Sequence, residues 1–204
     1  MTERQSDKQS DLQGAIARIS KALSGVVVGQ EPLVQELLVA LLAGGHVILE
    51  GVPGTGKTLT VRALSRLIQA DFGRIQLTPD ILPSDISGTN VFDLTSRTFT
   101  LKKGPVFTQV LLADEINRTP PKTQSALLEA MAERQVTVDN VRHRLSDTFF
   151  VIATQNPVEH HGTYPLPEAQ LDRFAMKVSI GYPGKGPERE MLAAAVGHPD
   201  GRPA

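Results

Sequence analysis

Apolar and polar positions alternate in blocks along the chain. Five blocks are short and mostly apolar, which is typical of buried strands; they are residues 46–50, 73–77, 109–115, 149–154 and 176–180. Apolar residues spaced three and four positions apart predict amphipathic helices over residues 15–23, 32–43, 59–68 and 122–133. Strands that alternate with helices favour an α/β fold, with a five-stranded parallel sheet flanked by helices.

Two segments depart from this alternation, and we interpret both as inserted β-hairpins. Residues 78–106 are punctuated by Pro and Gly, and within them Thr89–Phe92 and Thr98–Leu101 are β-prone runs around a polar turn. Residues 135–145 alternate valines with polar residues around Asp139-Asn140. The first insertion is either a contact for a partner or an inert surface loop.

The two ends of the chain differ from the middle. Residues 1–12 are polar and of mixed charge, so we expect a disordered tail. Residues 13–182 form the predicted core domain. Residues 183–204 are rich in Gly and Pro, and we expect a linker and the start of one more helix there.

Composition narrows the class of function. The formal net charge of −1 and an aromatic content of 4% give no case for nucleic-acid binding. The chain has no cysteine, so disulfides and thiolate chemistry are excluded. The N-terminus lacks an apolar signal-peptide region, and no apolar run is long enough to span a membrane. These features fit a cytoplasmic protein.

The strongest chemical signal is G-x-x-x-x-G-K-T, the phosphate-binding P-loop pattern, between a predicted strand and a predicted helix. Its residues are Gly51, Val52, Pro53, Gly54, Thr55, Gly56, Lys57 and Thr58. Glycine lets the backbone N–H groups approach an anion closely, and the helix N-terminus faces that anion. Lys57 adds a positive charge for the outer phosphates, and the Thr58 hydroxyl can bind Mg²⁺. The alternative is a glycine turn with an incidental lysine.

Further polar residues follow the predicted strands, where parallel sheets collect their ligands. Asp114 can hold Mg²⁺ and Glu115 can activate water, although two acids can also cap a helix N-terminus. Asn156 can orient water, or belong to an Asn-Pro turn. Arg173 can reach a neighbouring subunit's nucleotide, or pair locally with Asp172 or Glu168.

The adjacent pair His160 and His161 lacks the spacing of a metal site. Two metal ligands need side chains on one face, and beyond Glu159 no acid or histidine stands at helical spacing from them. We therefore interpret this pair as part of a solvated loop.

Taken together, these motifs resemble the AAA+ ATPases and, more narrowly, their MoxR family. The stretches that carry the resemblance are VVGQ (residues 27–30), LEGVPGTGKT (49–58), TPDILPSDISGTNVFD (78–93), LLADEINRTPPKTQSALLEAM (111–131) and ATQNPVEHHGTYPLPEAQLDRF (153–174). The resemblance extends from about residue 15 to about residue 196 and implies an AAA+ P-loop NTPase core for residues 13–182.

The resemblance also implies roles for individual residues. Gly51–Thr58 would be Walker A, and Asp114 and Glu115 would be Walker B, as Mg²⁺ ligand and water activator. Asn156 would be sensor 1 and Arg173 the arginine finger. The residues expected beside the adenine are Val28, Gly29 and Gln30. The expected cofactors are ATP and Mg²⁺.

At the level of the whole protein, the resemblance implies a homo-oligomeric ring, usually a hexamer. It implies chaperone-like remodelling, maturation or metal insertion of partner proteins, often with a von Willebrand factor A domain protein. Members of the family continue into a helical lid that carries a further arginine. Residues 183–204 match only the start of such a lid.

Two other functions remain open at this stage. Without most of a lid, the chain can be a nucleotide-binding docking module with little turnover. A nucleic-acid motor would also use a P-loop, but the net charge and the low aromatic content disfavour it.

Overall fold

The predicted strands form one sheet, in which every neighbouring pair is parallel. The computed structural model describes residues 3–52, 54–156, 162–182 and 184–189. The strand order is β2-β5-β8-β1-β9, and the pairs run parallel throughout. The bounds are β1 His46–Gly51, β2 Phe72–Gln76, β5 Val110–Asp114, β8 Phe150–Gln155 and β9 Phe174–Ile180. The five-stranded parallel sheet predicted from the sequence is therefore confirmed.

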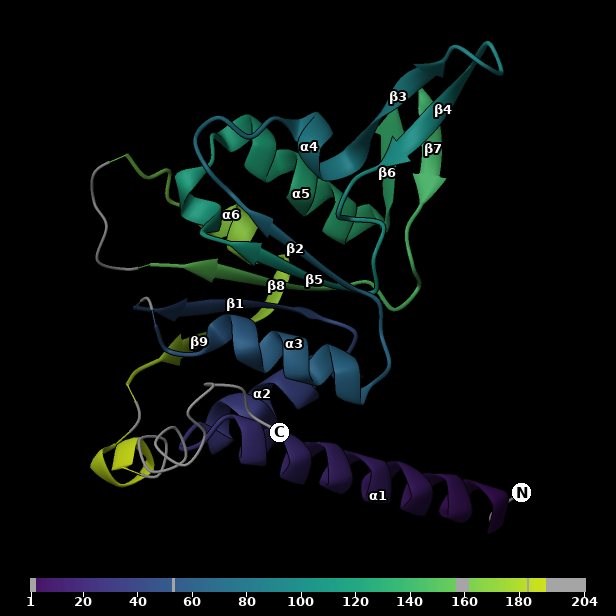
Figure 1. Ribbon diagram of the computed structural model, residues 1–204. Helices are drawn as coiled ribbons and strands as arrows, with labels where there is room; N and C mark the ends of the chain where they lie inside the picture. Colours follow the sequence, from purple (N-terminus) through teal and green to yellow (C-terminus); the bar gives the residue numbers. More distant parts are fainter. Residues whose placement is uncertain (1–2, 53, 157–161, 183, 190–204) are drawn as a thin grey trace.

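Helices cover both faces of this sheet (Figure 1). One face carries α1, α2 and α3, and the other carries α4 and α5. Their bounds are α1 Glu3–Val26, α2 Glu31–Leu42, α3 Lys57–Leu67, α4 Pro83–Ser87, the 3-10 turn η1 Ile116–Arg118, α5 Pro121–Glu133 and α6 Glu168–Leu171. Pro32 stands in the first turn of α2 and Gly44 follows its end, and these are the start and stop signals expected from the sequence.

The strands divide their side chains between two hydrophobic cores. Successive strand residues point to opposite faces of a sheet. Ile48 and Leu111 accordingly pack in the core beneath α5, while Leu49 and Leu112 pack in the core beneath α2 and α3. All four side chains are at most 1% exposed. Burial on both faces explains why these strands lack the apolar–polar alternation of a one-sided sheet.

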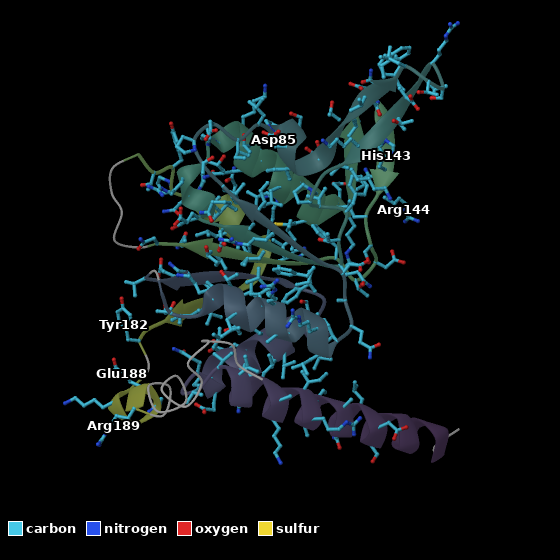
Figure 2. The ribbon with its side chains drawn as sticks, viewed as in Figure 1. Asp85, His143, Arg144, Tyr182, Glu188 and Arg189 are labelled. Atoms are coloured by element: carbon cyan, nitrogen blue, oxygen red, sulfur yellow. The ribbon has the colours of Figure 1, made fainter. Side chains whose placement is uncertain are left out.

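Both predicted hairpins are confirmed, and they lie side by side at one end of the molecule (Figure 1). The first pairs β3 (Gly88–Asp93) with β4 (Thr98–Lys103), and the second pairs β6 (Gln135–Val138) with β7 (Val141–Arg144). The Asn90 side-chain amide donates to Asp139 Oδ2 at 2.8 Å and joins the two hairpins. Figure 2 shows His143 and Arg144 on this side of the molecule, far from Tyr182 and Glu188 beyond β9.

The expected disordered tail over residues 1–12 is wrong for the part that the structure describes. Helix α1 begins at Glu3 and continues to Val26. No Pro or Gly interrupts residues 3–13, and Glu, Arg, Gln and Lys are good helix formers. The amphipathic segment that packs through Ile16, Ile19 and Leu23 therefore extends toward the N-terminus. At the other end, residues 185–189 are helical; the remainder of the predicted lid helix lies outside the described residues.

His46 is a buried histidine that links β1 to its surroundings. Its Nδ1 accepts the Val151 N–H at 3.0 Å, and its Nε2 lies 3.3 Å from the Met131 carbonyl oxygen. The first bond fixes the tautomer, because Nδ1 must be unprotonated and Nε2 then donates. Burial lowers the pKa of His46 from its ordinary value of 6.5, and Arg134 adds to this, while the bond to Met131 opposes it.

We expect the stability of the protein to fall as the pH drops below about 6.5, the ordinary pKa of histidine. In this range the unfolded chain binds a proton at His46 and the folded chain does not, so the free energy of unfolding falls by up to about 1.4 kcal/mol per pH unit. Urea denaturation between pH 7.5 and 5 measures the free energy of unfolding at each pH. Its slope against pH should be shallower for His46→Gln than for the wild type. A slope for His46→Gln equal to that of the wild type would contradict the assignment.

Candidate nucleotide-binding site

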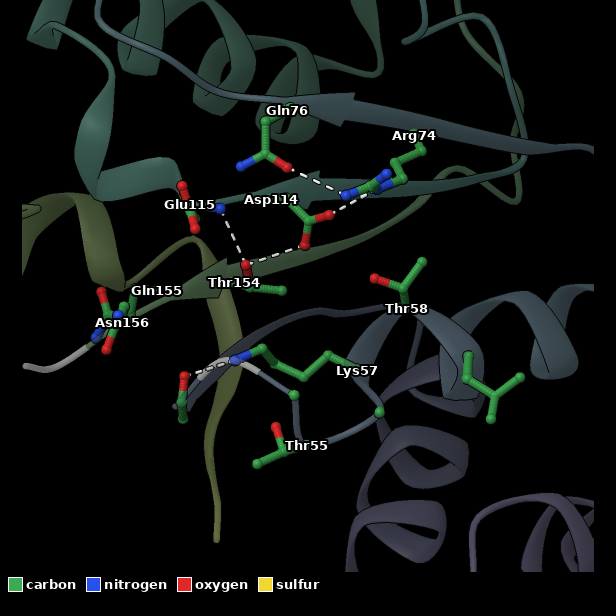
Figure 3. A pocket seen from close by; sticks show the side chains of 14 residues that line it. Thr55, Lys57, Thr58, Arg74, Gln76, Asp114, Glu115, Thr154, Gln155 and Asn156 are labelled. Atoms are coloured by element: carbon green, nitrogen blue, oxygen red, sulfur yellow. Dashed lines mark hydrogen bonds and ion pairs between the residues drawn. The ribbon is translucent and has the colours of Figure 1, made fainter. Parts of the chain in front are cut away.

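A cavity of about 470 Å³ opens at the carboxyl ends of the central strands (Figure 3). Its walls come from the P-loop, from the ends of β2, β5 and β8, and from the start of α3. The lining residues are Gly51, Gly54, Thr55, Gly56, Lys57, Thr58, Leu59, Arg74, Gln76, Asp114, Glu115, Thr154, Gln155 and Asn156. The structure thus brings together the P-loop, both acids and Asn156, as the sequence predicts. Pro53 lies outside the described residues.

The P-loop backbone has the conformation that its glycines permit. Gly54 has a φ of 83° and Gly56 a φ of 79°, values that side-chain-bearing residues rarely adopt. α3 begins at the next residue, Lys57, so the loop ends at a helix N-terminus that faces the cavity. Backbone N–H groups at such a terminus, with their partial positive charge, favour an anion.

Lys57 lies across the loop that it follows. Its ammonium donates to the carbonyl oxygens of Gly51 at 2.5 Å and Val52 at 3.0 Å. Burial lowers the pKa of Lys57, and the carboxylates of Asp114 and Glu115 oppose this shift. The lysine is therefore held over the phosphate-binding loop by contacts that an incoming phosphate oxygen can replace.

Asp114 ends β5 and is 7% exposed. Its Oδ1 accepts the Thr154 hydroxyl at 3.2 Å, and its Oδ2 accepts Arg74 Nε at 2.7 Å. The Thr154 oxygen in turn accepts the Glu115 N–H at 2.9 Å. One hydroxyl on β8 therefore fixes both the carboxylate of Asp114 and the backbone at Glu115.

Glu115 leaves the direction of the strand. Its φ of 59° and ψ of 51° are left-handed, which is uncommon outside glycine. This bend turns its side chain away from that of Asp114 (Figure 3). Arg118 Nη1 donates to Glu115 Oε2 at 3.1 Å. Backbone strain of this kind costs about 1–3 kcal/mol and concentrates at functional sites.

The donor set fits a magnesium ion that is shared with phosphate. Thr58 faces Asp114 across the cavity (Figure 3), and both offer oxygen ligands. Among the described residues, no group of three or more His, Cys, Asp or Glu side chains is placed to hold a metal. Mg²⁺ is commonly bound by one or two protein oxygens together with substrate phosphates rather than by a cage of side chains.

Asn156 is 8% exposed and lines the cavity just past the end of β8. β8 lies between β1 and β5 in the sheet. Asn156 therefore stands between the P-loop and the acids, where an amide can contact both a phosphate and a water molecule.

An ion pair with a further hydrogen bond ties three strands together beneath the P-loop. Glu50 Oε1 accepts the Gln155 amide at 2.6 Å and the Lys177 ammonium at 2.9 Å. The bond from Lys177 is the main cause of a lowered pKa at Glu50. These contacts join β8, β1 and β9 one residue before the loop begins.

Arg173 lies outside the cavity, between α6 and β9. Its side chain is exposed, and its Nη1 donates to the Ala169 carbonyl at 3.1 Å. This contact replaces the local pairing with Asp172 or Glu168 that the sequence left open. The pair His160 and His161 lies outside the described residues.

A smaller cavity of about 80 Å³ lies on the other side of the P-loop. It is lined by Val26, Val27, Val28, Gln30, Gly54, Thr55, Gly56 and Leu59. Val28 and Gln30 thus lie beside the loop, as expected for residues near a base, and Gly29 between them has a φ of 75°. Gln30 Nε2 donates to the Gly181 carbonyl at 2.9 Å, so this side of the site connects to the chain just after β9.

Sequence reasoning missed five of the lining residues: Leu59, Arg74, Gln76, Thr154 and Gln155. Arg74 and Gln76 are two positions apart on β2, and so they share one face of the strand. β2 neighbours β5 at the edge of the sheet. Knowledge of the strand order would have placed both side chains beside Asp114, but the sequence does not provide this order.

This combination defines a class. A P-loop after β1, an acidic pair after β5 and a polar residue after the intervening strand β8 characterise P-loop nucleotide-binding proteins of the α/β type. Residues 46–176 match the model of the ATPase family associated with various cellular activities (AAA). The chain belongs to this family and, within it, to the MoxR group of AAA+ proteins.

Individual relatives support the assignment. The chain is 52% identical to chaperone MoxR1 of Mycobacterium tuberculosis, over 82% of this chain and 44% of that protein. It is 54% identical to the uncharacterized protein YeaC of Bacillus subtilis, over 91% of this chain and 58% of that protein. The crystal structure of a proposed ATPase from Cytophaga hutchinsonii has a TM-score of 0.85 and 46% identity, and the match covers 99% of this chain and 62% of that one.

The chain therefore spans about half the length of the curated relatives that it matches.

In the part of the chain that the structure describes, no helix is long and apolar enough to cross a membrane.

We expect Lys57→Met to weaken nucleotide binding at least tenfold, because it removes the cation that lies over the loop. Titration with a fluorescent ATP analogue measures this affinity. Lys122→Met is the matched control, since Lys122 is exposed on α5 and does not line the cavity. Equal affinities of the Lys57 and Lys122 variants would contradict a phosphate-binding role for Lys57.

Proposed function

We propose that this chain is the ATP-hydrolysing core of a chaperone-like AAA+ protein that uses Mg²⁺ and remodels partner proteins. The observation that carries the proposal is the convergence of Lys57, Thr58, Asp114 and Glu115 on one cavity. A passive phosphate-binding loop needs the first two residues only. The two acids on the facing strand supply what hydrolysis needs in addition.

Each residue has a chemical task in this proposal. The P-loop N–H groups and Lys57 bind the phosphates, and Thr58 and Asp114 would hold Mg²⁺. The metal, when bound, neutralises charge on the phosphates. Glu115 accepts a proton from the attacking water, and Asn156 orients that water against the terminal phosphate.

Arg173 completes the site from a neighbouring copy of the chain. Its exposed guanidinium lies outside its own cavity, as a trans-acting arginine requires. We therefore propose a homo-oligomer, with a hexameric ring as the expectation from the family resemblance. Hydrolysis then depends on assembly.

The proposed target of the ATP-driven remodelling is another protein. Chaperone MoxR1, 52% identical to this chain, is named as a chaperone, and the family resemblance suggests a partner with a von Willebrand factor A domain. Maturation or metal loading of the target follows from the same resemblance, and a cytoplasmic location is proposed from the composition of the chain. ATP rather than GTP is the proposed nucleotide on that ground.

The test is ATP hydrolysis as a function of protein concentration, with Mg²⁺ present. We expect turnover to rise faster than linearly, because each site needs an arginine from a neighbour. Arg173→Ala should lower turnover about 10³-fold or more. Arg142→Ala is the matched control, because Arg142 is an exposed arginine on β7.

Glu115→Gln separates hydrolysis from binding. It should lower turnover about 10²- to 10⁴-fold while nucleotide affinity stays close to that of the wild type. If the wild-type chain binds nucleotide but shows no turnover at any protein concentration, the proposal is wrong for this chain. That result would favour a nucleotide-binding docking module instead.

A further inference from the structure

Arg74 forms the shortest ion pair among the described residues that line the cavity. Its Nε donates to Asp114 Oδ2 at 2.7 Å. Its Nη2 donates to Gln76 Oε1 at 3.1 Å, which holds the guanidinium from the other side. Figure 3 shows the chain of contacts from Gln76 through Arg74, Asp114 and Thr154 to the backbone of Glu115.

The strand register explains how Arg74 reaches the acid. Gln76 lies opposite Asp114 in the β2–β5 pairing, and Arg74 lies opposite Leu112. The long arginine side chain therefore extends along the sheet toward its carboxyl edge. The side chain is 49% exposed, whereas that of Asp114 is 9% exposed. One partner of the ion pair is buried, and the other is half exposed at the cavity.

The Asp114 carboxylate is already engaged at both oxygens. Thr154 donates to Oδ1 and Arg74 donates to Oδ2. A magnesium ion, or water bound to it, needs a lone pair of this same carboxylate. Thr154 is a neutral donor at 3.2 Å, while Arg74 brings a full positive charge at 2.7 Å. The guanidinium is therefore the competitor of a cation for Asp114.

We propose that Arg74 competes with Mg²⁺ for Asp114, and that it is a positioning residue which makes metal and nucleotide binding interdependent. This inference rests on the proposed Mg²⁺-dependent nucleotide site. In the metal-free site Arg74 compensates the buried carboxylate, which would otherwise repel phosphate. In the metal-bound site Mg²⁺ takes over that compensation, and Arg74 moves away from Asp114 into the cavity.

The proposal differs from a direct phosphate-binding role for Arg74 in its thermodynamic signature. Loss of a phosphate ligand weakens nucleotide binding in the same proportion with and without Mg²⁺. Loss of a competitor leaves an uncompensated carboxylate in the metal-free site and frees the ligand in the metal-bound site. The informative quantity is thus the ratio of the dissociation constants in EDTA and in Mg²⁺, which reports the coupling between the two ligands.

The experiment measures this ratio for the full chain with a fluorescent ADP analogue. We expect Arg74→Met to increase the ratio of the dissociation constants about tenfold. The variant loses the charge that compensates Asp114 in EDTA, whereas in Mg²⁺ the metal ion supplies that charge. Mn²⁺, followed by electron paramagnetic resonance as a direct probe of the metal, should bind the nucleotide complex of this variant more tightly. An unchanged or smaller ratio would overturn the proposal.

Three further variants make the result specific. Arg142→Met, an exposed arginine on β7, removes the same charge from the chain but should keep the wild-type ratio. Arg74→Lys keeps the charge and should give a ratio between those of the wild type and Arg74→Met. In an Asp114→Asn background, Arg74→Met should have no further effect, because the competed ligand is gone; a full effect there would overturn the proposal.

Two outcomes separate the inference from the function on which it rests. If the wild-type chain binds no nucleotide, the proposed function and the inference both fail. If it binds nucleotide with Mg²⁺ dependence and Arg74→Met leaves the ratio unchanged, only the inference fails.

Thermal melting of each variant shows that the protein is folded, and Mg²⁺ with ADP should raise the melting temperature of Arg74→Met more than that of the wild type.

Discussion

Parallel pairing of the strands is the constraint on which the site depends. Because β5, β8 and β1 are neighbours that run in one direction, their carboxyl ends open at one edge of the sheet. Because β8 lies between them, β1 with its P-loop and β5 with its acids are two strand spacings apart, about 9.6 Å. That spacing makes room for phosphate and places Thr154 and Asn156 between the P-loop and the acids.

Charge in and around the site is balanced in pairs. Asp114 pairs with Arg74, Glu115 with Arg118 and Glu50 with Lys177. In each pair the cation is between two fifths and one half exposed, whereas the carboxylate is more buried. The buried carboxylate keeps a counter-charge in the free protein, and a ligand that brings its own cation can replace it.

Much of this arrangement was predictable from the sequence, and the limits have physical causes. Apolar runs and glycine-rich turns are local signals, and they located the five strands, both hairpins and the P-loop. The extent of α1 was underestimated because polar helix formers carry no periodicity. The left-handed bend at Glu115 and the reach of Arg74 depend on strand order and register. Such long-range pairings leave no mark in a local pattern.

β2 leads from the nucleotide site to the β3–β4 hairpin, two features that the sequence analysis treated separately. It carries Arg74 toward Asp114, and Leu77, the first residue after the strand, donates its N–H to the Asp114 carbonyl at 2.8 Å. The chain then continues through α4, whose Ile86 is buried in the core beneath α5, into the β3–β4 hairpin. The exposed hairpin and the acid of the nucleotide site are thus joined by one short segment, in which Leu77 and Ile86 are buried. Leu77 and Ile86 are the two buried residues that anchor this segment between the nucleotide site and the hairpin.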